Sequence, residues 1–332
     1  MKPYLYLKGL KELVHELNGN EIIHIGIRPY GFHAGNTVAL IVYPFLLCKF
    51  FSDRGLVPKF RFVISINDWE QDALDGPDPR KYPFNIRPKT SSLQFTPDDF
   101  GCCRSIVDHW EKRIKDRVSL IQKKFKEISL KFVRNSELIE YESCRVFLAE
   151  TVRNPRKQLA ILKKHSDADI LDEPIQFAGV VCPKCKKTKG DTRSSVGAEI
   201  NWVCHTCSYS SSGDIRDFDY WWYHKPMLIA RLDIFNVDVT LSGGDHFSEG
   251  DFNIRRDFIR TFSPKTKEPL MLFTPTVFAK DGNKMSKSRN NTEFSDIGKL
   301  IKAMSDYDGG RFDIRDELIT DSLDEKDYSH IL

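Results

Sequence analysis

The chain has 332 residues, of which 40% are hydrophobic, and its 50 basic and 47 acidic side chains leave a net charge of +3. This composition allows a well-packed interior, which excludes a disordered or fibrous protein, and so small a net charge does not require a nucleic-acid partner. The length can hold one doubly wound α/β core of about 200 residues plus insertions. Because the start Met1-Lys2-Pro3 has no secretory apolar core and no run predicts a membrane span, we expect a soluble, cytoplasmic protein without a membrane partner.

The first predicted unit is a strand, a helix and a second strand. β-Branched runs at 21–27 and 59–66 predict the strands, and the largely apolar segment 37–52 between them predicts the helix. Pro44 interrupts this helix, and an interior proline costs about 3 kcal/mol or produces a kink. The turn at 29–36, Pro-Tyr-Gly-Phe-His-Ala-Gly-Asn, lies where a helix N-terminus presents unpaired N–H groups and a positive dipole end to an anion.

This turn contains the side chains that a nucleotide site needs. Gly31 and Gly35 let the backbone approach a nucleotide, while His33 and Asn36 can donate hydrogen bonds to phosphate oxygens. By itself the turn fits a simple helix cap with a surface histidine equally well, because a single glycine turn is a weak match.

Two segments follow before the paired cysteines. Residues 76–97 carry five prolines, which predict a long loop. Residues 108–134 place apolar side chains three and four apart, which predicts an amphipathic helix. Such a helix directs a basic face outward, which can contact an RNA backbone but more often is only solvated. The basic residues of that face are Lys112, Arg113, Lys115, Arg117, Lys123, Lys124 and Lys126.

Four of the eight cysteines form two CxxC pairs, Cys182 with Cys185 and Cys204 with Cys207, and eighteen residues separate the pairs. This spacing is typical of a four-thiolate zinc ribbon. Four protein ligands leave no open position on the ion, so we expect a structural Zn²⁺ that does no chemistry. Disulfides are the alternative, which an intracellular chain disfavours. We expect the other four cysteines to be ordinary buried or loop thiols, because nothing pairs them with a base: Cys48, Cys102, Cys103 and Cys144.

Near the end of the chain, two lysines lie three residues apart in the pentapeptide Lys284-Met285-Ser286-Lys287-Ser288. The pentapeptide follows an apolar run at 270–278, which predicts a strand, and the turn dipeptide Asp281-Gly282. Two ammonium groups on a loop at a strand end can close over a triphosphate. The alternative is a solvated basic hairpin tip, but the presence of both this loop and the turn at 29–36 favours a nucleotide site.

Together, the turn at 29–36 and the loop at 284–288 resemble the two phosphate-handling motifs of class I aminoacyl-tRNA synthetases. Three further stretches are most similar to the class I lysyl-tRNA synthetase: 66–69, 97–102, and 230–246, which ends in Gly243-Gly244-Asp245-His246 where that family has Gly-Lys-Asp-His. The resemblance implies a Rossmann-type catalytic core, ATP and Mg²⁺ as cosubstrates, and activation of an amino acid as its adenylate.

The resemblance also implies roles for residues of this chain. The expected catalytic residues are His33, Asn36, Lys284 and Lys287. The expected ATP-binding residues are Gly31, Gly35, Gly243, Asp245, His246, Met285, Ser286 and Ser288. The expected amino-acid-binding residues are Gly26, Arg28, His246 and Phe273.

Several positions depart from the family pattern. The family's first motif has one more residue between its glycine and its histidine than this chain has. Arg28 stands where the family has a small hydroxyl residue, and Gly244 replaces a lysine. Leu232 and Phe273 replace a tryptophan and a tyrosine that the resemblance would put near the amino acid. A cation at Arg28 would repel a lysine side chain, so lysine, a lysine analogue or a different amino acid all stay open as the substrate.

The resemblance also suggests a division of the chain. We expect the first half of the core at 1–95, a connecting insertion with the zinc ribbon at 96–220, the second half at 221–290 and a short tail at 291–332. The tail is too short for an independently stable anticodon-binding domain, so we expect a free-standing core that meets tRNA through its acceptor arm. Two alternatives remain: transfer of the activated amino acid to a small molecule or peptide, and a catalytically silent RNA-binding or regulatory protein.

Overall fold

This computed structural model describes most of the chain. The described residues are 2–29, 34–68, 98, 100–165, 180–185, 190–220, 224–248, 251–285 and 296–319. The expected proline-rich loop at 76–97 lies outside them.

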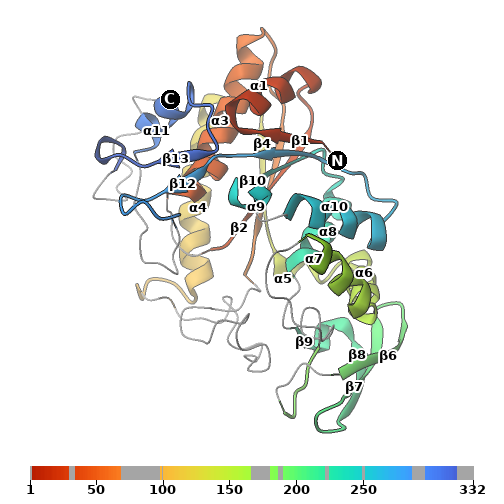
Figure 1. The fold of residues 1–332 in the computed structure, drawn as a ribbon. Coiled ribbons are helices and arrows are strands. Elements are labelled where there is room, and N and C mark those ends of the chain that lie inside the picture. Colours follow the sequence, from red (N-terminus) through yellow and green to blue (C-terminus); the bar gives the residue numbers. More distant parts are fainter. Residues whose placement is uncertain are drawn as a thin grey trace.

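The centre of the molecule is a six-stranded sheet in which every neighbouring pair is parallel (Figure 1). A parallel sheet of this kind is covered by helices on both faces, and its strands are therefore mostly apolar. In spatial order the strands are β1 (Pro3–Leu5), β11 (Leu270–Phe273), β10 (Val239–Ser242), β2 (Ile22–Ile27), β3 (Arg61–Ile66) and β4 (Ser129–Arg134).

Two sets of helices cover the two faces of this sheet (Figure 1). The first face packs against α1 (Tyr6–Glu16), α2 (Ala34–Thr37), η1 (Val38–Val42), α3 (Tyr43–Asp53), α4 (Ile106–Lys124) and α11 (Ile297–Met304). The second face packs against α8 (His224–Phe235) and α10 (Asp251–Phe262), with α5 (Asn135–Leu138), α6 (Glu142–Arg153) and α7 (Pro155–His165) in the same apolar cluster. The fold is thus the doubly wound α/β arrangement that the sequence predicts.

Alternation along the central strands decides which side chains meet which set of helices. In β2, Ile23, Ile25 and Ile27 belong to the cluster of the first face, while Ile22 belongs to that of the second. His24 is fully buried on the same side as Ile22, because successive side chains of a strand point to opposite faces. The second face of the sheet therefore contains a buried polar side chain in an otherwise apolar strand.

The helix that follows β2 runs without a break from Ala34 to Asp53, although it contains Pro44. One turn of it is a π-helix, in which the Tyr43 N–H donates to the Val38 carbonyl five residues earlier. A wider turn accommodates the proline, which has no N–H and would collide with the preceding turn of a regular α-helix. The helix therefore continues through Pro44 without interruption.

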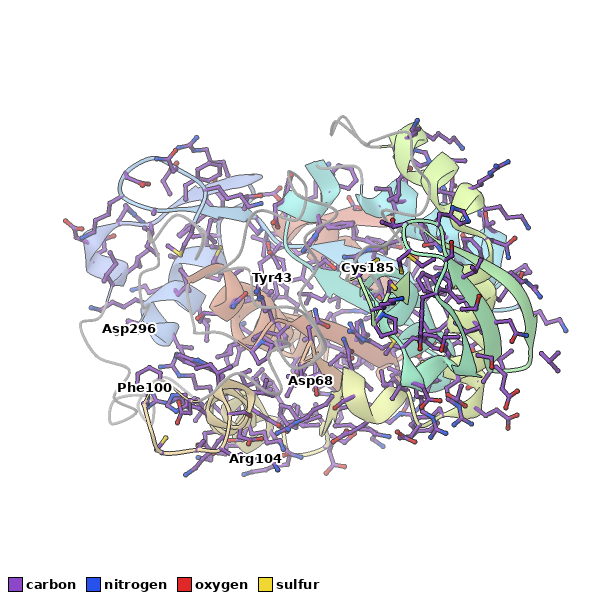
Figure 2. All side chains as sticks on the ribbon, turned by 90° about the horizontal axis from the view of Figure 1, so that it is seen from below. Tyr43, Asp68, Phe100, Arg104, Cys185 and Asp296 are labelled. Atoms are coloured by element: carbon purple, nitrogen blue, oxygen red, sulfur yellow. The ribbon has the colours of Figure 1, made fainter. Side chains whose placement is uncertain are left out.

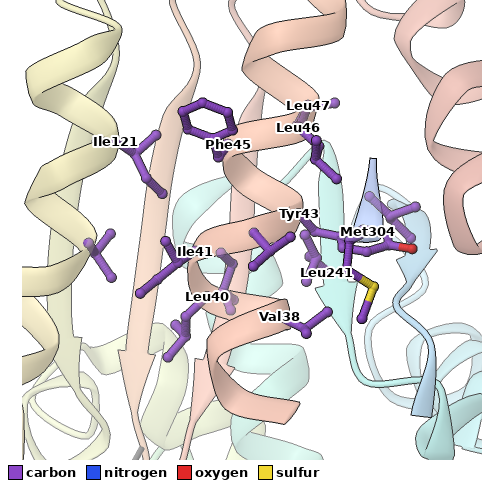
Figure 3. Packing of buried hydrophobic residues seen from close by; sticks show 14 of the residues in the cluster. Val38, Leu40, Ile41, Tyr43, Phe45, Leu46, Leu47, Ile121, Leu241 and Met304 are labelled. Carbon is purple, nitrogen blue, oxygen red and sulfur yellow. The ribbon is translucent and has the colours of Figure 1, made fainter. Parts of the chain in front are cut away.

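The same helix meets a length and composition test for a membrane span, contrary to the expectation that no run would. However, 72% of its most apolar window is buried inside the protein, against the sheet and neighbouring helices. Figure 3 shows Leu46 and Tyr43 of this helix near Leu241 of β10 and Met304 of α11, and Phe45 facing Ile121 of α4. Its apolar length is used for core packing.

The predicted helix at 108–134 is wrong in its second half. Helix α4 ends at Lys124, and residues 129–134 form β4, which pairs with β3. The polar and apolar residues of 129–134, Ser-Leu-Lys-Phe-Val-Arg, alternate only in part and continue the helical spacing before them. The outward basic face is also smaller than predicted, because Arg117 is only 5% exposed. Helix α4 and strand β4, which fall inside the expected insertion at 96–220, pack on or belong to the central sheet.

The apolar run 270–278 forms two strands instead of one. Residues 270–273 are β11 of the central sheet, and β12 (Thr276–Phe278) leaves it to pair with β13 (Arg311–Asp313). Pro275 separates them, and it cannot donate to a sheet ladder. The lysine-containing loop therefore follows a short separate strand beside the carboxyl edge of the sheet.

Candidate active site

The carboxyl ends of the central strands open into a cavity of about 400 Å³. The chain passes from β2 outward to β3 and β4, then returns to place β10 on the other side of β2. The loops after β2 and β10 consequently diverge, and ligands of open α/β sheets bind at such a switch point. Among the described residues, the cavity is lined by segments that lie more than 200 positions apart, such as Gly35 and Lys284.

The mouth of the cavity contains the start of the helix after β2. Gly35 and Asn36, both in α2, line it. Their partners in the predicted phosphate turn, Gly31 and His33, lie outside the described residues. The described part of the turn is therefore where a phosphate-binding helix N-terminus would be.

The loop at 279–285 brings Lys284 to the same mouth. Gly282 has a φ of +75°, which suits glycine, and its N–H donates to the Ala279 carbonyl at 2.9 Å. The Met285 N–H then donates to the Val277 carbonyl at 2.9 Å, which fixes the loop against β12. Lys284 and Met285 both line the cavity, whereas Ser286, Lys287 and Ser288 lie outside the described residues.

The Lys284 ammonium forms an ion pair with the Asp245 carboxylate at 2.7 Å. Burial by itself would raise the pKa of Asp245, but the adjacent His246 and the Lys284 ammonium outweigh it and hold the pKa below its ordinary value. Asp245 and His246 begin the short helix α9 (Asp245–Ser248), and both line the cavity with Gly243. Two of the expected motifs thus meet through a direct contact.

Steric crowding explains why residue 244 is a glycine. A Cβ built at this position would lie 2.3 Å from the Thr274 carbonyl oxygen and 3.1 Å from the Thr276 nitrogen. Both are backbone atoms, and the loops after β10 and β11 touch here. The site therefore has no room for the lysine that the family pattern has at this position.

The residues expected around the amino acid fall into two groups. Gly26 and Arg28, with His246, line the cavity. Phe273 does not line it, because its ring packs 5.2 Å from that of Phe247 in a separate apolar cluster. Leu232 is likewise part of the core of the second face.

Three residues at the inner end of the cavity were not predicted: His24, Arg231 and Arg255. The Arg231 guanidinium lies among amide oxygens, with its Nε 3.0 Å from Asn135 Oδ1 and its Nη2 donating to Asn67 Oδ1 as well. The sequence signal that could have found these residues was a histidine or arginine at a position where the apolar pattern of its strand or helix predicts burial. Periodicity alone treats such positions as core.

The four predicted zinc ligands come together at one end of the three-stranded antiparallel sheet of β6 (Gly190–Val196), β7 (Glu199–Cys204) and β8 (Ser210–Asp214). The sulfurs of Cys182 and Cys207 are 3.7 Å apart, and those of Cys185 and Cys204 are 3.5 Å apart. Disulfide sulfurs lie about 2 Å apart. Thiolates bound tetrahedrally at Zn–S distances of about 2.3 Å lie about 3.8 Å apart. The geometry fits a four-thiolate ion site, and no disulfide joins these four cysteines in this structure.

A second group of potential metal ligands was missed. Asp98, Cys102, Cys103 and His109 place one ligand atom each within 4.8 Å of all the others. Cys102 Sγ is 3.1 Å from His109 Nδ1 and 3.6 Å from Cys103 Sγ. The expectation that nothing pairs these thiols with a base is therefore wrong for Cys102. The cue was present in the sequence as adjacent cysteines between an aspartate and a histidine, but it does not have the CxxC form.

The two groups lie in different parts of the molecule. Figure 2 shows Cys185 beside the β6–β8 sheet and Phe100, which belongs to the loop of the second group, beside α4. The Phe100 ring stacks on His109 with centroids 4.3 Å apart. Neither group is among the described residues that line the cavity.

An all-parallel doubly wound sheet with a cavity at its switch point is the arrangement of Rossmann-type nucleotide-binding proteins. The family model described as tRNA synthetases class I (K) matches residues 11–305. The chain belongs to this family of class I aminoacyl-tRNA synthetases.

Two lysine–tRNA ligases are similar to this chain at low identity. The lysine–tRNA ligase of Thermococcus kodakarensis is 26% identical over 312 residues, which cover 88% of this chain and 55% of that protein. The lysine–tRNA ligase of Haloarcula marismortui is 26% identical over 211 residues, 59% of this chain and 36% of that protein. The chain thus spans about half the length of the first of these relatives, and less of the second.

Solved structures give weaker likenesses. A tyrosyl-tRNA synthetase from Archaeoglobus fulgidus, complexed with L-tyrosine, covers 85% of this chain and 63% of its own at 13% identity and a TM-score of 0.42. A tryptophanyl-tRNA synthetase from Campylobacter jejuni covers 86% and 64% at 13% identity and a TM-score of 0.37.

Proposed function

We propose that this chain activates an amino acid with ATP, forming an aminoacyl adenylate and releasing pyrophosphate. The observation that supports this most is the convergence of three distant segments, 35–36, 243–246 and 284–285, on one cavity at the switch point of the sheet. A helix N-terminus, a carboxylate and a lysine there match the needs of a nucleotide triphosphate that must be held and split.

The proposed reaction is an in-line displacement. The carboxylate of the amino acid attacks the α-phosphorus of ATP, a new P–O bond forms, and the bond from that phosphorus to the β-phosphate oxygen breaks, with both electrons leaving on pyrophosphate. No general base is required, because the carboxylate is already an anion near neutral pH. Catalysis then consists of positioning the reactants and stabilising charge on the phosphates.

The residues of the mouth would share this work. Asn36 would donate to phosphate oxygens at the start of the helix, and Lys284 would neutralise the departing pyrophosphate. Asp245 holds the Lys284 ammonium in the present structure, so binding of ATP would exchange one anionic partner of Lys284 for another. His33 and Lys287 join this set through the resemblance alone, and Mg²⁺ would arrive with the triphosphate.

The acceptor in this proposal is tRNA, as it is in the family. Contact would involve the acceptor arm, the zinc ribbon and the exposed lysines of α4. Transfer to a small molecule or peptide is the alternative. Charging assays with tRNA variants separate these: an acceptor-arm reader charges tRNAs with altered anticodons equally well, and failure to charge any tRNA favours the alternative.

The experiment that tests the activation step is amino-acid-dependent exchange of pyrophosphate into ATP. Lys284→Ala should lower the exchange rate about a hundredfold, the usual cost of removing one preorganised transition-state contact. Lys280→Ala is the matched control, because Lys280 belongs to the same loop but pairs with Asp316 at 2.5 Å, away from the cavity. Exchange at the parent rate in Lys284→Ala would remove the assignment of the loop, whereas absence of exchange by the parent protein with every amino acid would favour a catalytically silent protein.

A further inference from the structure

The cavity has an inner end that the nucleotide does not explain. It extends past the strand ends onto the second face of the sheet, where His24 and Thr240 line it. These two residues lie side by side in the register of β2 and β10. His24 is three residues before Ile27, the last residue of β2, so at about 3.3 Å per residue it lies roughly 10 Å below the edge where phosphates would bind.

Two buried polar atoms at this end have no hydrogen-bond partner among the described residues: His24 Nδ1 and Thr240 Oγ1. The side chains are 0% and 2% exposed. The imidazole is held in place from its other nitrogen, since Nε2 lies 2.9 Å from Ser65 Oγ. Leaving a buried polar atom unsatisfied costs about 1–3 kcal/mol, so two of them facing one cavity indicate a polar ligand.

The charge at this end is positive. Arg231 and Arg255 are 3% and 8% exposed, and both line the cavity. Arg255 Nη1 donates to Ser242 Oγ at 2.8 Å. Burial lowers the pKa of Arg255 to about 10, which still leaves it protonated at neutral pH. Burial, with both arginines nearby, lowers the pKa of His24 well below its ordinary value, so its ring is neutral.

The described lining residues contain one carboxylate, Asp245, and it lies at the mouth in contact with Lys284. A lysine side chain that entered the inner end would bring its ammonium, stripped of water, towards two guanidinium groups. A carboxylate in the same place would meet two cations and two unsatisfied polar groups, which give short and strong charge-assisted hydrogen bonds. Charge therefore discriminates between these two substrates in favour of the acid.

We propose that the inner end of the cavity binds the side-chain carboxylate of the amino acid that this chain activates, so that its substrate is an acidic amino acid rather than lysine. The claim that the bound acid is a substrate rests on the proposed function, whereas the claim that the inner end binds an acid does not. The α-carboxylate of the same molecule stays near the mouth, where it attacks ATP. Glutamate and 2-aminoadipate are the candidates of suitable length, and 2-aminoadipate matches lysine in length with the opposite side-chain charge.

The test begins with calorimetric titration of the full chain, without ATP, using L-glutamate, L-2-aminoadipate and L-lysine. One of the two acids should bind at least tenfold more tightly than lysine. Arg255→Gln should weaken binding of that acid at least tenfold and leave ATP binding unchanged. Arg256→Gln is the matched control, because Arg256 lies on the same helix but contacts Asp257 and the Phe252 ring outside the described lining.

Thr240→Val serves as a second variant in case Arg255→Gln does not fold, since it removes one hydroxyl at almost constant shape. It should weaken binding of the acid about fivefold. Lysine binding as tightly as the better of the two acids, or binding of neither acid, would overturn the proposal, as would unchanged affinity in the folded variants. Pyrophosphate exchange then separates the two ideas: an acid that binds but supports no exchange refutes the proposed activation and leaves the binding site standing.

Discussion

Replacing Gly244 by alanine tests how tightly the loops after β10 and β11 are packed. The added Cβ would lie 2.3 Å from the Thr274 carbonyl oxygen, about 1 Å closer than an ordinary contact. That oxygen cannot move away freely, because the Thr274 N–H donates to Ser242 at 3.0 Å and the Thr276 N–H donates to Gly310 at 2.8 Å. The loop after β10 must therefore shift as a unit, and Asp245 is in it.

The magnitude follows from two opposing effects. Overpacking of this kind costs about 1–3 kcal/mol. Loss of glycine's freedom in the unfolded chain returns about 0.4–1 kcal/mol. At the middle of both ranges the net destabilisation is about 1.3 kcal/mol, which at roughly 2–4 °C per kcal/mol lowers the melting temperature by about 3–5 °C. A shift near 1 Å at the Asp245–Lys284 pair should also reduce pyrophosphate exchange by up to about a hundredfold.

Thermal unfolding followed by circular dichroism measures the first effect, and pyrophosphate exchange well below the melting temperature measures the second. Gly26→Ala is the control for stability, because a Cβ there would meet Arg231 Nη1 at 3.4 Å and His24 Cε1 at 3.8 Å, both ordinary contacts. It should melt at or slightly above the parent temperature. If Gly244→Ala is as stable and as active as the parent protein, the backbone contact between the loops is not the constraint that we infer.

The remaining predictions concern the ion sites and one ion pair. Metal analysis of the purified chain should find two zinc ions. Cys204→Ala and His109→Ala should each remove one ion and loosen the segment that holds it, because the binding energy of a structural ion is largely folding energy. A folded, fully active, metal-free chain would contradict this prediction. Burial acts to raise the pKa of Asp257, but His165 and Lys164 outweigh it and hold the pKa at about 2. Since the unfolded value is about 3.9, this carboxylate stabilises the fold above that pH and loses the effect as the pH falls towards 2. Denaturant titrations should show Asp257→Asn to be less stable than the parent at pH 7 and equal to it near pH 2; a difference that does not change with pH would mean that packing, and not charge, is responsible.

The sequence by itself was sufficient for features that are local. Runs of β-branched residues marked β2 and β3 to within two residues, because strand propensity and apolar content are properties of short segments. The CxxC pairs predicted four sulfurs that the structure does bring together, since each pair forms one short turn. The two motifs near Asn36 and Lys284 predicted that these distant segments lie close together, and residues of both line one cavity.

Tertiary structure decided what depends on contacts between segments. The lysine-bearing stretch 129–134 has no helical or strand preference strong enough to separate it from α4, and only pairing with β3 makes it the edge of the sheet. Asp98 and His109 become neighbours of two cysteines through the folding of one loop onto α4. The inner end of the cavity is the clearest case: Arg231 and Arg255 lie on different helices, and each occupies a position that periodicity assigns to the core. Their meeting over His24 follows from how α8 and α10 pack on the second face of the sheet, which no local pattern specifies.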